Sequence, residues 1–243
     1  MFITSLENEK IKKLLKLQKK KYRDLENKYY VEGYHLVQEA FKAGVLLEVL
    51  QIDEAPYFEV DTYVVSEEIM KKLSTTDTPT NIIGVCRKID YDEIKGNHLL
   101  LLDEIQDPGN LGTIIRSAVA FGVDMILLSR NTVDLYNSKV LRSTQGLYCH
   151  IPIVSVDSVP TINSLKENGY KICGTDVTGG IDIRNIDKSE LTKYCLIMGN
   201  EGNGVSREIK ELCDCNFYIP MSNDVESLNV GVACSIILYE LER

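Results

Sequence analysis

Short apolar runs alternate with amphipathic segments along this chain, and the alternation predicts an α/β protein. The continuous apolar runs at 99–102, 125–128 and 195–198 are typical of strands buried on both faces of a sheet. Segments with helical periodicity separate them, and strands that alternate with helices form mostly parallel sheets. The other elements expected in this half are helices at 112–121, 137–145, 158–168, 205–212 and 228–241, and strands at 151–154, 171–174 and 217–219.

The first 90 residues contain a smaller alternation of their own. Thr4 and Glu7 have the spacing of a capping box, and the positions after them predict an amphipathic helix with a basic outer face. The polar segment 91–97 contains Gly96 and predicts a linker. We therefore expect a small α/β domain at 1–92 and a larger one at 98–243. Further strands are expected at 29–33, 45–52, 61–65 and 82–87, with helices at 35–43 and 66–73.

Charge is distributed unevenly along the chain. The net charge is −9, yet residues 1–30 carry nine Lys or Arg against four Asp or Glu. A basic segment on an acidic protein is a candidate for phosphate contact, and Lys12, Lys16 and Lys20 are its candidate contacts. The alternative is an ordinary solvated helix face.

Cysteine usage and hydropathy limit the class of protein. There are seven cysteines, and Cys213 and Cys215 have no second pair that would complete a zinc site. The alternative that fits is a set of scattered buried or half-buried thiols. No apolar stretch reaches the roughly 18 residues that a membrane span needs. The start of the chain lacks a signal-peptide core, so we expect a cytoplasmic protein without a membrane partner.

Three blocks carry glycine and polar residues directly after apolar runs. They cover residues 107–118, 198–204 and 219–230. Ligands bind outside the carboxyl ends of the strands in an open parallel sheet, so three such ends predict one composite ligand site. The glycines at 199–204 have the spacing GxxGxG, the reverse of the dinucleotide fingerprint, and a plain strand-to-helix turn explains that block equally well.

Two polar positions in these blocks call for partners. Asn229 is expected just inside an apolar helix whose N-cap would be Ser227, and an amide there needs a hydrogen-bond partner. Arg116 follows Asn110, which is expected in a turn, by six residues and lies among apolar neighbours. The alternative to a functional Arg116 is a structural ion pair with Asp103 or Glu104. Residue chemistry alone leaves both readings open.

Together and in this order, the three blocks resemble the SpoU (TrmH-type) branch of the SPOUT methyltransferase superfamily. The likeness covers 98–243 and rests on Asn110-Leu111-Gly112 with Arg116-Ser117-Ala118, on Gly199-Asn200-Glu201-Gly202, and on Ile219-Pro220-Met221 with Ser227-Leu228-Asn229. Residues 1–90 resemble more loosely a substrate-binding domain related to a ribosomal-protein fold. That second likeness rests on Glu32-Gly33, Thr78-Pro79 and Ile83-Gly84.

The resemblance implies methyl transfer from S-adenosylmethionine to a ribose 2′-hydroxyl of RNA, without a metal. It also implies a deep trefoil knot and a homodimer formed through the C-terminal domain. By motif matching, Gly199, Ile219, Met221 and Leu228 would line the cofactor pocket. Arg116 would act on the hydroxyl, either as proton acceptor or as a stabiliser of the developing alkoxide. Asn110, Glu201, Ser227 and Asn229 would orient Arg116 and the ribose.

The hypothesis we favour is an rRNA ribose 2′-O-methyltransferase, with large-subunit rRNA preferred over tRNA because of the extra N-terminal domain. In this setting the basic N-terminal helix gains a phosphate-contact role. The alternatives are a tRNA 2′-O-methyltransferase and a non-catalytic RNA-binding protein of ribosome assembly. A nicotinamide-dependent oxidoreductase fits poorly, because the glycine spacing is reversed and the loop comes late in the chain.

Overall fold

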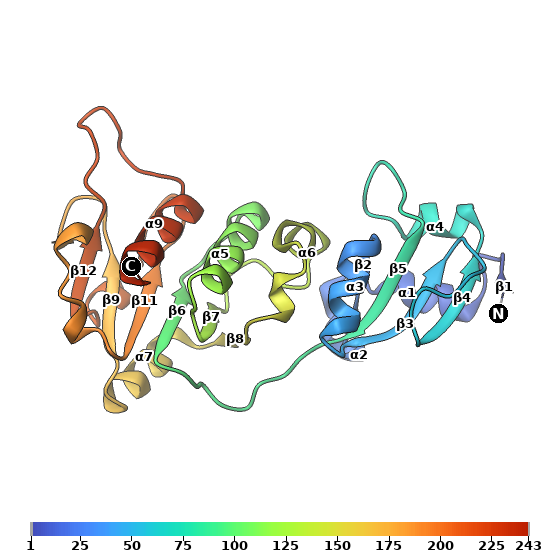
Figure 1. Cartoon of the computed structure of the whole chain (residues 1–243), viewed down its shortest axis with the longest axis horizontal. Helices are drawn as coiled ribbons and strands as arrows, with labels where there is room; N and C mark the ends of the chain where they lie inside the picture. Colours follow the sequence, from blue (N-terminus) through green and yellow to red (C-terminus); the bar gives the residue numbers. More distant parts are fainter. Residues whose placement is uncertain (1, 243) are drawn as a thin grey trace. The chain divides into compact units, whose positions relative to one another are not determined.

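A computed structural model describes residues 2–242, and in it the chain forms two compact units. Figure 1 colours the chain by residue number and labels the helices and strands. Each unit contains a sheet of its own. The first consists of the described part of Met1–Asp90 together with Asp134–His150, and the second of Tyr91–Val133 together with the described part of Ile151–Arg243.

These units differ from the predicted domains 1–92 and 98–243 chiefly in the segment Asp134–His150, which belongs to the first unit although it lies within the second predicted domain. Asp134 forms an ion pair with Arg23, which is buried. Tyr148 shares a hydrogen bond with Tyr29, their hydroxyl oxygens 3.0 Å apart. These contacts include groups that are costly to bury without partners, so they explain why the segment packs with the first unit.

The first unit is built on a mixed five-stranded sheet in the order β1-β4-β3-β5-β2. Strand β5 runs antiparallel to β3 and β2, whereas β4 is parallel to β3 and β1. The elements are β1 (Phe2–Ile3), α1 (Glu9–Lys16), α2 (Lys20–Glu26), β2 (Lys28–Glu32), α3 (Tyr34–Lys42), β3 (Leu46–Gln51), β4 (Asp61–Val65), α4 (Glu67–Leu73), β5 (Ile82–Arg87), α6 (Ser138–Thr144) and the 3-10 turn η1 (Leu147–Cys149).

The N-terminal helix starts later than its sequence pattern predicts. The expected capping box at Thr4 and Glu7 is wrong, because the side chain of Asn8 caps α1 by accepting a hydrogen bond of 2.9 Å from the Lys10 N–H. The amphipathic segment also divides into α1 and α2. Leu17 is buried at the division, so the core contact continues although the helix ends.

The second unit is built on a seven-stranded sheet in the order β10-β12-β9-β11-β6-β7-β8, in which every neighbouring pair is parallel. This confirms the predicted α/β fold. Helices α7 and α8 cover one face through Ile162, Leu165 and Ile209. The elements are β6 (His98–Leu102), α5 (Pro108–Ala120), β7 (Met125–Ser129), β8 (Ile153–Val156), α7 (Ser158–Glu167), β9 (Lys171–Thr175), β10 (Ile181–Asp182), η2 (Ile183–Asn185), η3 (Lys188–Glu190), β11 (Tyr194–Met198), α8 (Arg207–Lys210), β12 (Cys215–Tyr218) and α9 (Val230–Glu242).

Helix α5 begins at Pro108, four residues before the predicted start. Proline fits the first turn of a helix, because the N–H that it lacks has no partner there. The Asp107 carboxylate then caps the helix by accepting a hydrogen bond of 2.8 Å from the Asn110 N–H. Asn110 therefore lies in the first helical turn and not in the expected loop. Helix α5 packs against α9, as Figure 1 also shows.

Two further findings concern the part of the chain that the structure describes. Within residues 2–242, no helix combines the length and apolar character needed to cross a membrane. The same residues contain no group of three or more His, Cys, Asp or Glu side chains placed to hold a metal ion. The knot implied by the family resemblance stays a prediction.

Candidate active site

The second unit contains a cavity of about 300 Å³ at the carboxyl ends of β9, β11 and β12. Residues that directly follow these strands form its walls, together with the start of α9. This is the edge of a parallel sheet at which ligands bind, and the volume lies within the range of ligand pockets. Two of the three sequence blocks, 198–204 and 219–230, therefore meet around one cavity.

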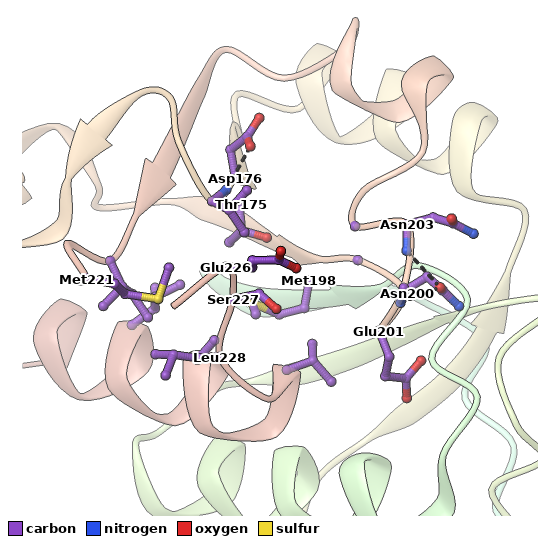
Figure 2. Close-up of a pocket in the computed structure, with 18 of the residues that line it drawn as sticks. Thr175, Asp176, Met198, Asn200, Glu201, Asn203, Met221, Glu226, Ser227 and Leu228 are labelled. Atoms are coloured by element: carbon purple, nitrogen blue, oxygen red, sulfur yellow. Dashed lines mark hydrogen bonds between the residues drawn. The ribbon is translucent and has the colours of Figure 1, made fainter. Parts of the chain in front are cut away.

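All four residues predicted to contact a cofactor line this cavity. They are Gly199, Ile219, Met221 and Leu228. Figure 2 shows Met221 and Leu228 on one side of it, and Asn200 and Glu201 on the other. The cavity thus has one largely apolar wall and one wall made of a polar glycine-rich loop.

Gly199 allows two parts of the glycine-rich loop to approach each other closely. A Cβ atom at this position would lie 2.0 Å from the backbone nitrogen of Val205. The Asn200 side chain holds the loop further, because its amide nitrogen donates to the Glu104 carbonyl at 2.8 Å and its oxygen accepts from the Gly202 N–H at 2.9 Å. A larger residue at position 199 would displace backbone and not merely a flexible side chain.

Three of the five residues predicted to act in catalysis, Asn110, Glu201 and Asn229, are brought together in one chain of hydrogen bonds. The Asn110 amide nitrogen donates to Glu201 Oε1 at 3.0 Å. The Asn110 oxygen accepts from the Asn229 amide nitrogen at 2.8 Å. Asn110 therefore joins the glycine-rich loop, helix α5 and helix α9, which belong to the three different sequence blocks.

Glu201 is fixed by backbone donors as well as by Asn110. Its carboxylate accepts from the Asp107 N–H at 2.9 Å and from the Gln106 N–H at 3.1 Å. Partial burial alone would raise the pKa of Glu201, but the hydrogen bonds from Asn110, Asp107 and Gln106 outweigh it and lower the pKa below the ordinary value. Glu201 is thus held as a carboxylate at neutral pH.

Asn229 caps helix α9, a role that the sequence assigned to Ser227. The Asn229 oxygen accepts from the N–H groups of Gly231 at 3.0 Å and Val232 at 3.2 Å. Its amide nitrogen remains available for Asn110, so one side chain serves both the helix and the chain of hydrogen bonds. Ser227 lines the cavity. The expected N-cap at Ser227 is therefore wrong.

Arg116 is not among the residues that line the cavity. It is an exposed residue of α5, whereas Asn110 on the same helix is 9% exposed. The proposed structural ion pair does not form, because Asp103 accepts from the Ser206 N–H at 2.9 Å and Glu104 accepts from the Asn131 amide at 2.7 Å. Within residues 2–242, no hydrogen bond joins Arg116 to Asn110, Glu201, Ser227 or Asn229.

The cavity also contains polar residues that sequence reasoning missed. Lys210 forms an ion pair with Asp176, with Nζ 2.8 Å from the carboxylate oxygen, and this contact lowers the pKa of Asp176. Thr175 and Glu226 line the same cavity. Asp176 follows β9 directly, so its place at a strand end could have identified it, but nothing in the local sequence distinguishes Lys210.

The three predicted RNA contacts lie in the first unit and differ in their surroundings. Lys12 is 2.7 Å from a Glu7 carboxylate oxygen and 3.7 Å from one of Glu9. Lys16 and Lys20 are exposed and form no ion pair within the described residues. The basic face is therefore partly neutralised at Lys12 and, within the described residues, carries its charge without an ion pair at the other two positions, with Lys16 Nζ 5.7 Å from the centre of the Tyr22 ring.

Comparison with known proteins agrees with this geometry. The chain matches the model of the SpoU rRNA Methylase family over residues 97–239 and that of the MRM3-like substrate binding domain over residues 8–84. A 23S rRNA (guanosine(2553)-2′-O)-methyltransferase, RlmP, from Bacillus subtilis (strain 168) is 40% identical over 245 residues, 98% of each chain. An uncharacterised tRNA/rRNA methyltransferase from Synechocystis is 32% identical over 257 residues, 99% of this chain and 93% of the relative.

Solved structures resemble both units. The S-adenosylmethionine-bound rRNA methyltransferase from Sinorhizobium meliloti matches with a TM-score of 0.87 and 28% identity, covering 99% of this chain and 97% of the other. A putative TrmH-family RNA methyltransferase from Porphyromonas gingivalis matches with a TM-score of 0.88 and 29% identity, covering 98% and 99%. These findings confirm the resemblance drawn from the three blocks: the chain belongs to the SpoU rRNA methylase family of RNA methyltransferases.

Proposed function

We propose that this enzyme transfers a methyl group from S-adenosylmethionine to a ribose 2′-hydroxyl of large-subunit rRNA. The proposal rests on the position of the cavity beside the chain of hydrogen bonds that joins Glu201, Asn110 and Asn229. Glu201 belongs both to this chain and to the cavity wall. A cofactor in the cavity would therefore lie next to a set of fixed polar groups. The relative from Bacillus subtilis, whose name specifies 23S rRNA and 2′-O-methylation, supports the choice of substrate.

The cavity suits S-adenosylmethionine in shape and chemistry. Ile219, Met221 and Leu228 offer an apolar surface for an adenine ring, and the tight backbone turn at Gly199 presents peptide groups to a polar ligand. Lys210 and Asp176 offer both charges to a zwitterionic amino-acid group. When bound, S-adenosylmethionine supplies a methyl group on a sulfonium, which an oxygen nucleophile can attack directly. The structure bound to this cofactor from Sinorhizobium meliloti supports the assignment.

Arg116 is the residue we assign to the ribose hydroxyl. Oxygen becomes a better nucleophile as its proton leaves, and a nearby guanidinium stabilises the alkoxide that develops. A guanidinium ordinarily stays protonated above pH 12, so we favour electrostatic stabilisation with only transient proton transfer. The exposed position of Arg116 suits a group that meets its partner when RNA binds. Asn110, Glu201, Ser227 and Asn229 would hold the ribose in line with the methyl group.

The first unit would hold the RNA. Its match to a substrate-binding domain supports this role, as do the exposed Lys16 and Lys20 near the start of the chain. Contacts with phosphates supply much of the affinity of RNA-binding proteins. We place the protein in the cytoplasm, where bacterial ribosomes are assembled.

We also propose that the second unit forms a homodimer. Helix α9 exposes Val232 (46%), Ile236 (36%) and Tyr239 (53%) at a spacing that puts them on one helical face. Sedimentation should show a dimer for the unchanged protein and a monomer after Ile236→Asp. A monomeric unchanged protein would contradict this part of the proposal.

The experiment that tests the proposed reaction is transfer of labelled methyl from S-adenosylmethionine to unmodified rRNA and tRNA pools, followed by digestion to nucleosides. We expect label in rRNA as a 2′-O-methylated nucleoside. Label in tRNA alone would correct the RNA class, and label on a base would refute the chemistry. Cofactor binding without transfer to naked RNA or to precursor ribosomal particles would favour the non-catalytic alternative.

A further inference from the structure

Two cysteine thiols meet outside the candidate active site. Cys173 in β9 and Cys215 in β12 are direct partners in the register of neighbouring parallel strands, which lie side by side in Figure 1. Their sulfur atoms are 3.6 Å apart and share a hydrogen bond. Cys173 is fully buried and Cys215 is half-buried, so a small molecule in solvent reaches Cys215 first.

We propose that Cys173 and Cys215 form an oxidation site that closes to a disulfide when it meets a peroxide, and that the disulfide lowers the affinity of the neighbouring cavity for its ligand. The register supports the first part, because cross-strand neighbours fall within the range of Cα separations that disulfides require. The strands that carry the two thiols lead directly into the cavity, which supports the second part.

Cys215 is the more reactive of the two thiols. The hydrogen bond with Cys173 lowers the pKa of Cys215, and the nearby Lys171 ammonium acts in the same direction. The contact with Cys215 and burial raise the pKa of Cys173, and burial raises the pKa of Cys213 to about 11. Thiolates are the reactive form of cysteine, so Cys215 should react before its neighbour two residues earlier.

The reaction balances with a peroxide as the oxidant. The Cys215 thiolate attacks one peroxide oxygen, the O–O bond breaks, and the departing oxygen takes up a proton to become water or an alcohol. Cys215 is then a sulfenic acid. The Cys173 sulfur attacks the Cys215 sulfur, the S–S bond forms as the S–O bond breaks, and the Cys173 proton leaves with the hydroxide as water. Two thiols are oxidised and one peroxide is reduced.

The two strands connect this site to the cavity. Thr175 lies two residues after Cys173, and Ile219 lies four residues after Cys215; both line the cavity. The Cα atoms of bonded cysteines are most often about 5.5–6 Å apart, wider than the about 4.8 Å between neighbouring strands, so disulfide formation strains the spacing of β9 and β12. Packed interiors transmit such strain, and the two cavity walls should therefore shift.

The test treats the reduced full-length protein with hydrogen peroxide and maps its peptides without reduction. We expect one linked pair of peptides containing Cys173 and Cys215, with the loss of two hydrogens. The pair should be absent from Cys215→Ser and Cys173→Ala and present in the matched control Cys213→Ser. Thermal melts before treatment would verify that each variant is folded. A Cys213–Cys215 bond, or a Cys215 that proceeds to sulfinic acid without linkage, would overturn the proposal.

The second measurement is calorimetric titration of reduced and oxidised protein with S-adenosylmethionine, and it rests on the proposed function. Displaced cavity walls should lower the affinity about tenfold, with recovery after reduction by a dithiol. Peroxide should leave the affinity of Cys173→Ala unchanged. A full yield of disulfide with unchanged affinity would refute the link to the cavity. If the reduced protein does not bind the cofactor, the proposed function fails, while peptide mapping still decides the oxidation site.

Discussion

Glu32 in the first unit and Glu201 in the second are carboxylates with similar partners and different surroundings. Glu32 is 9% exposed and accepts hydrogen bonds from the Ser74 hydroxyl at 2.8 Å and the Thr75 N–H at 3.0 Å. Glu201 also accepts from backbone N–H groups of a distant segment, but it is an exposed residue at the wall of a cavity. Glu32 holds the loop that contains Ser74 and Thr75. Glu201 holds the backbone at Gln106 and Asp107 and also the side chain of Asn110.

This comparison shows that a well-bonded carboxylate does not by itself indicate a reactive site. Removal of such a group from a closed interior costs stability, because its donors lose their partner. Removal of the same group beside a ligand cavity costs activity, because the groups that contact the ligand lose their position. We therefore expect changes around Glu32 to affect unfolding, and changes around Glu201 to affect methyl transfer.

The largest effect should come from Arg116, an exposed cation of the second unit. Arg116→Ala should slow methyl transfer by about 100-fold or more, the range seen when one stabilising donor of a developing oxyanion is removed. The melting temperature should stay unchanged, because Arg116 is exposed and forms no hydrogen bond within residues 2–242. Single-turnover kinetics with labelled cofactor would measure the rate, and a melting curve would provide the control. An unchanged rate would remove Arg116 from the mechanism.

The next effect concerns Glu32 and sharpens the contrast with Glu201. Glu32→Gln should lower the free energy of unfolding by about 1–3 kcal/mol, because a neutral amide replaces an acceptor of several hydrogen bonds in a buried setting. Denaturant unfolding would measure the change. Glu93→Gln is the control, since the ion pair that Glu93 forms within residues 2–242 is with the exposed Lys95, and its loss should leave stability unchanged. Equal effects of the two substitutions would mean that the Glu32 contacts contribute nothing.

A smaller effect should separate the lysines of the first unit. The double change Lys16→Gln and Lys20→Gln should reduce the slope of log affinity for RNA against log salt by about one to two, because two phosphate contacts are lost. Lys12→Gln should change the slope less, because Glu7 already neutralises Lys12 in the free protein. Binding titrations at several salt concentrations would measure this. An unchanged slope in the double variant would support the solvated-face alternative.

The smallest effect is the pH dependence of Glu201. Its pKa is lower in the folded protein than the ordinary value of 4.5, so the stability it contributes is complete above that value. That stability is lost as the pH falls through the lowered pKa. The difference in unfolding free energy between unchanged protein and Glu201→Gln should therefore be constant near neutral pH and shrink in acid. A difference that grows in acid would reverse the assigned direction of the shift.

The sequence predicted every strand of the second sheet except the two-residue β10, Ile181–Asp182. The central strands were clear because parallel strands buried on both faces give continuous apolar runs. Helix ends were predicted less well. The position of Asn229 depends on a side chain that caps α9 and at the same time bonds to Asn110, which lies 119 residues earlier. Local spacing gives no information about such a partner, and Ser227 was the better cap on local grounds.

Local sequence also failed to predict the exposure of Arg116 and the packing of the segment Asp134–His150, because it does not show which distant residues meet. An arginine among apolar neighbours suggested a buried ion pair, but Arg116 occupies the exposed side of α5. Asp134–His150 continues the β-α alternation of the second unit in sequence, yet it packs with the first unit through Arg23 and Tyr29. Both outcomes depend on contacts between distant residues. The four cofactor-contact candidates line one cavity, and their contact with a cofactor stays a prediction.

The measurement that tests this comparison most directly is a double-mutant cycle between Asn110 and Glu201. If Glu201 serves the site through Asn110, Asn110→Ala and Glu201→Gln each slow methyl transfer, and the double variant is no slower than Asn110→Ala alone. Cofactor affinity measured alongside separates positioning from loss of binding. If the two losses instead multiply in the double variant, Glu201 acts independently of Asn110, and the account of Glu201 as a positioning residue is contradicted.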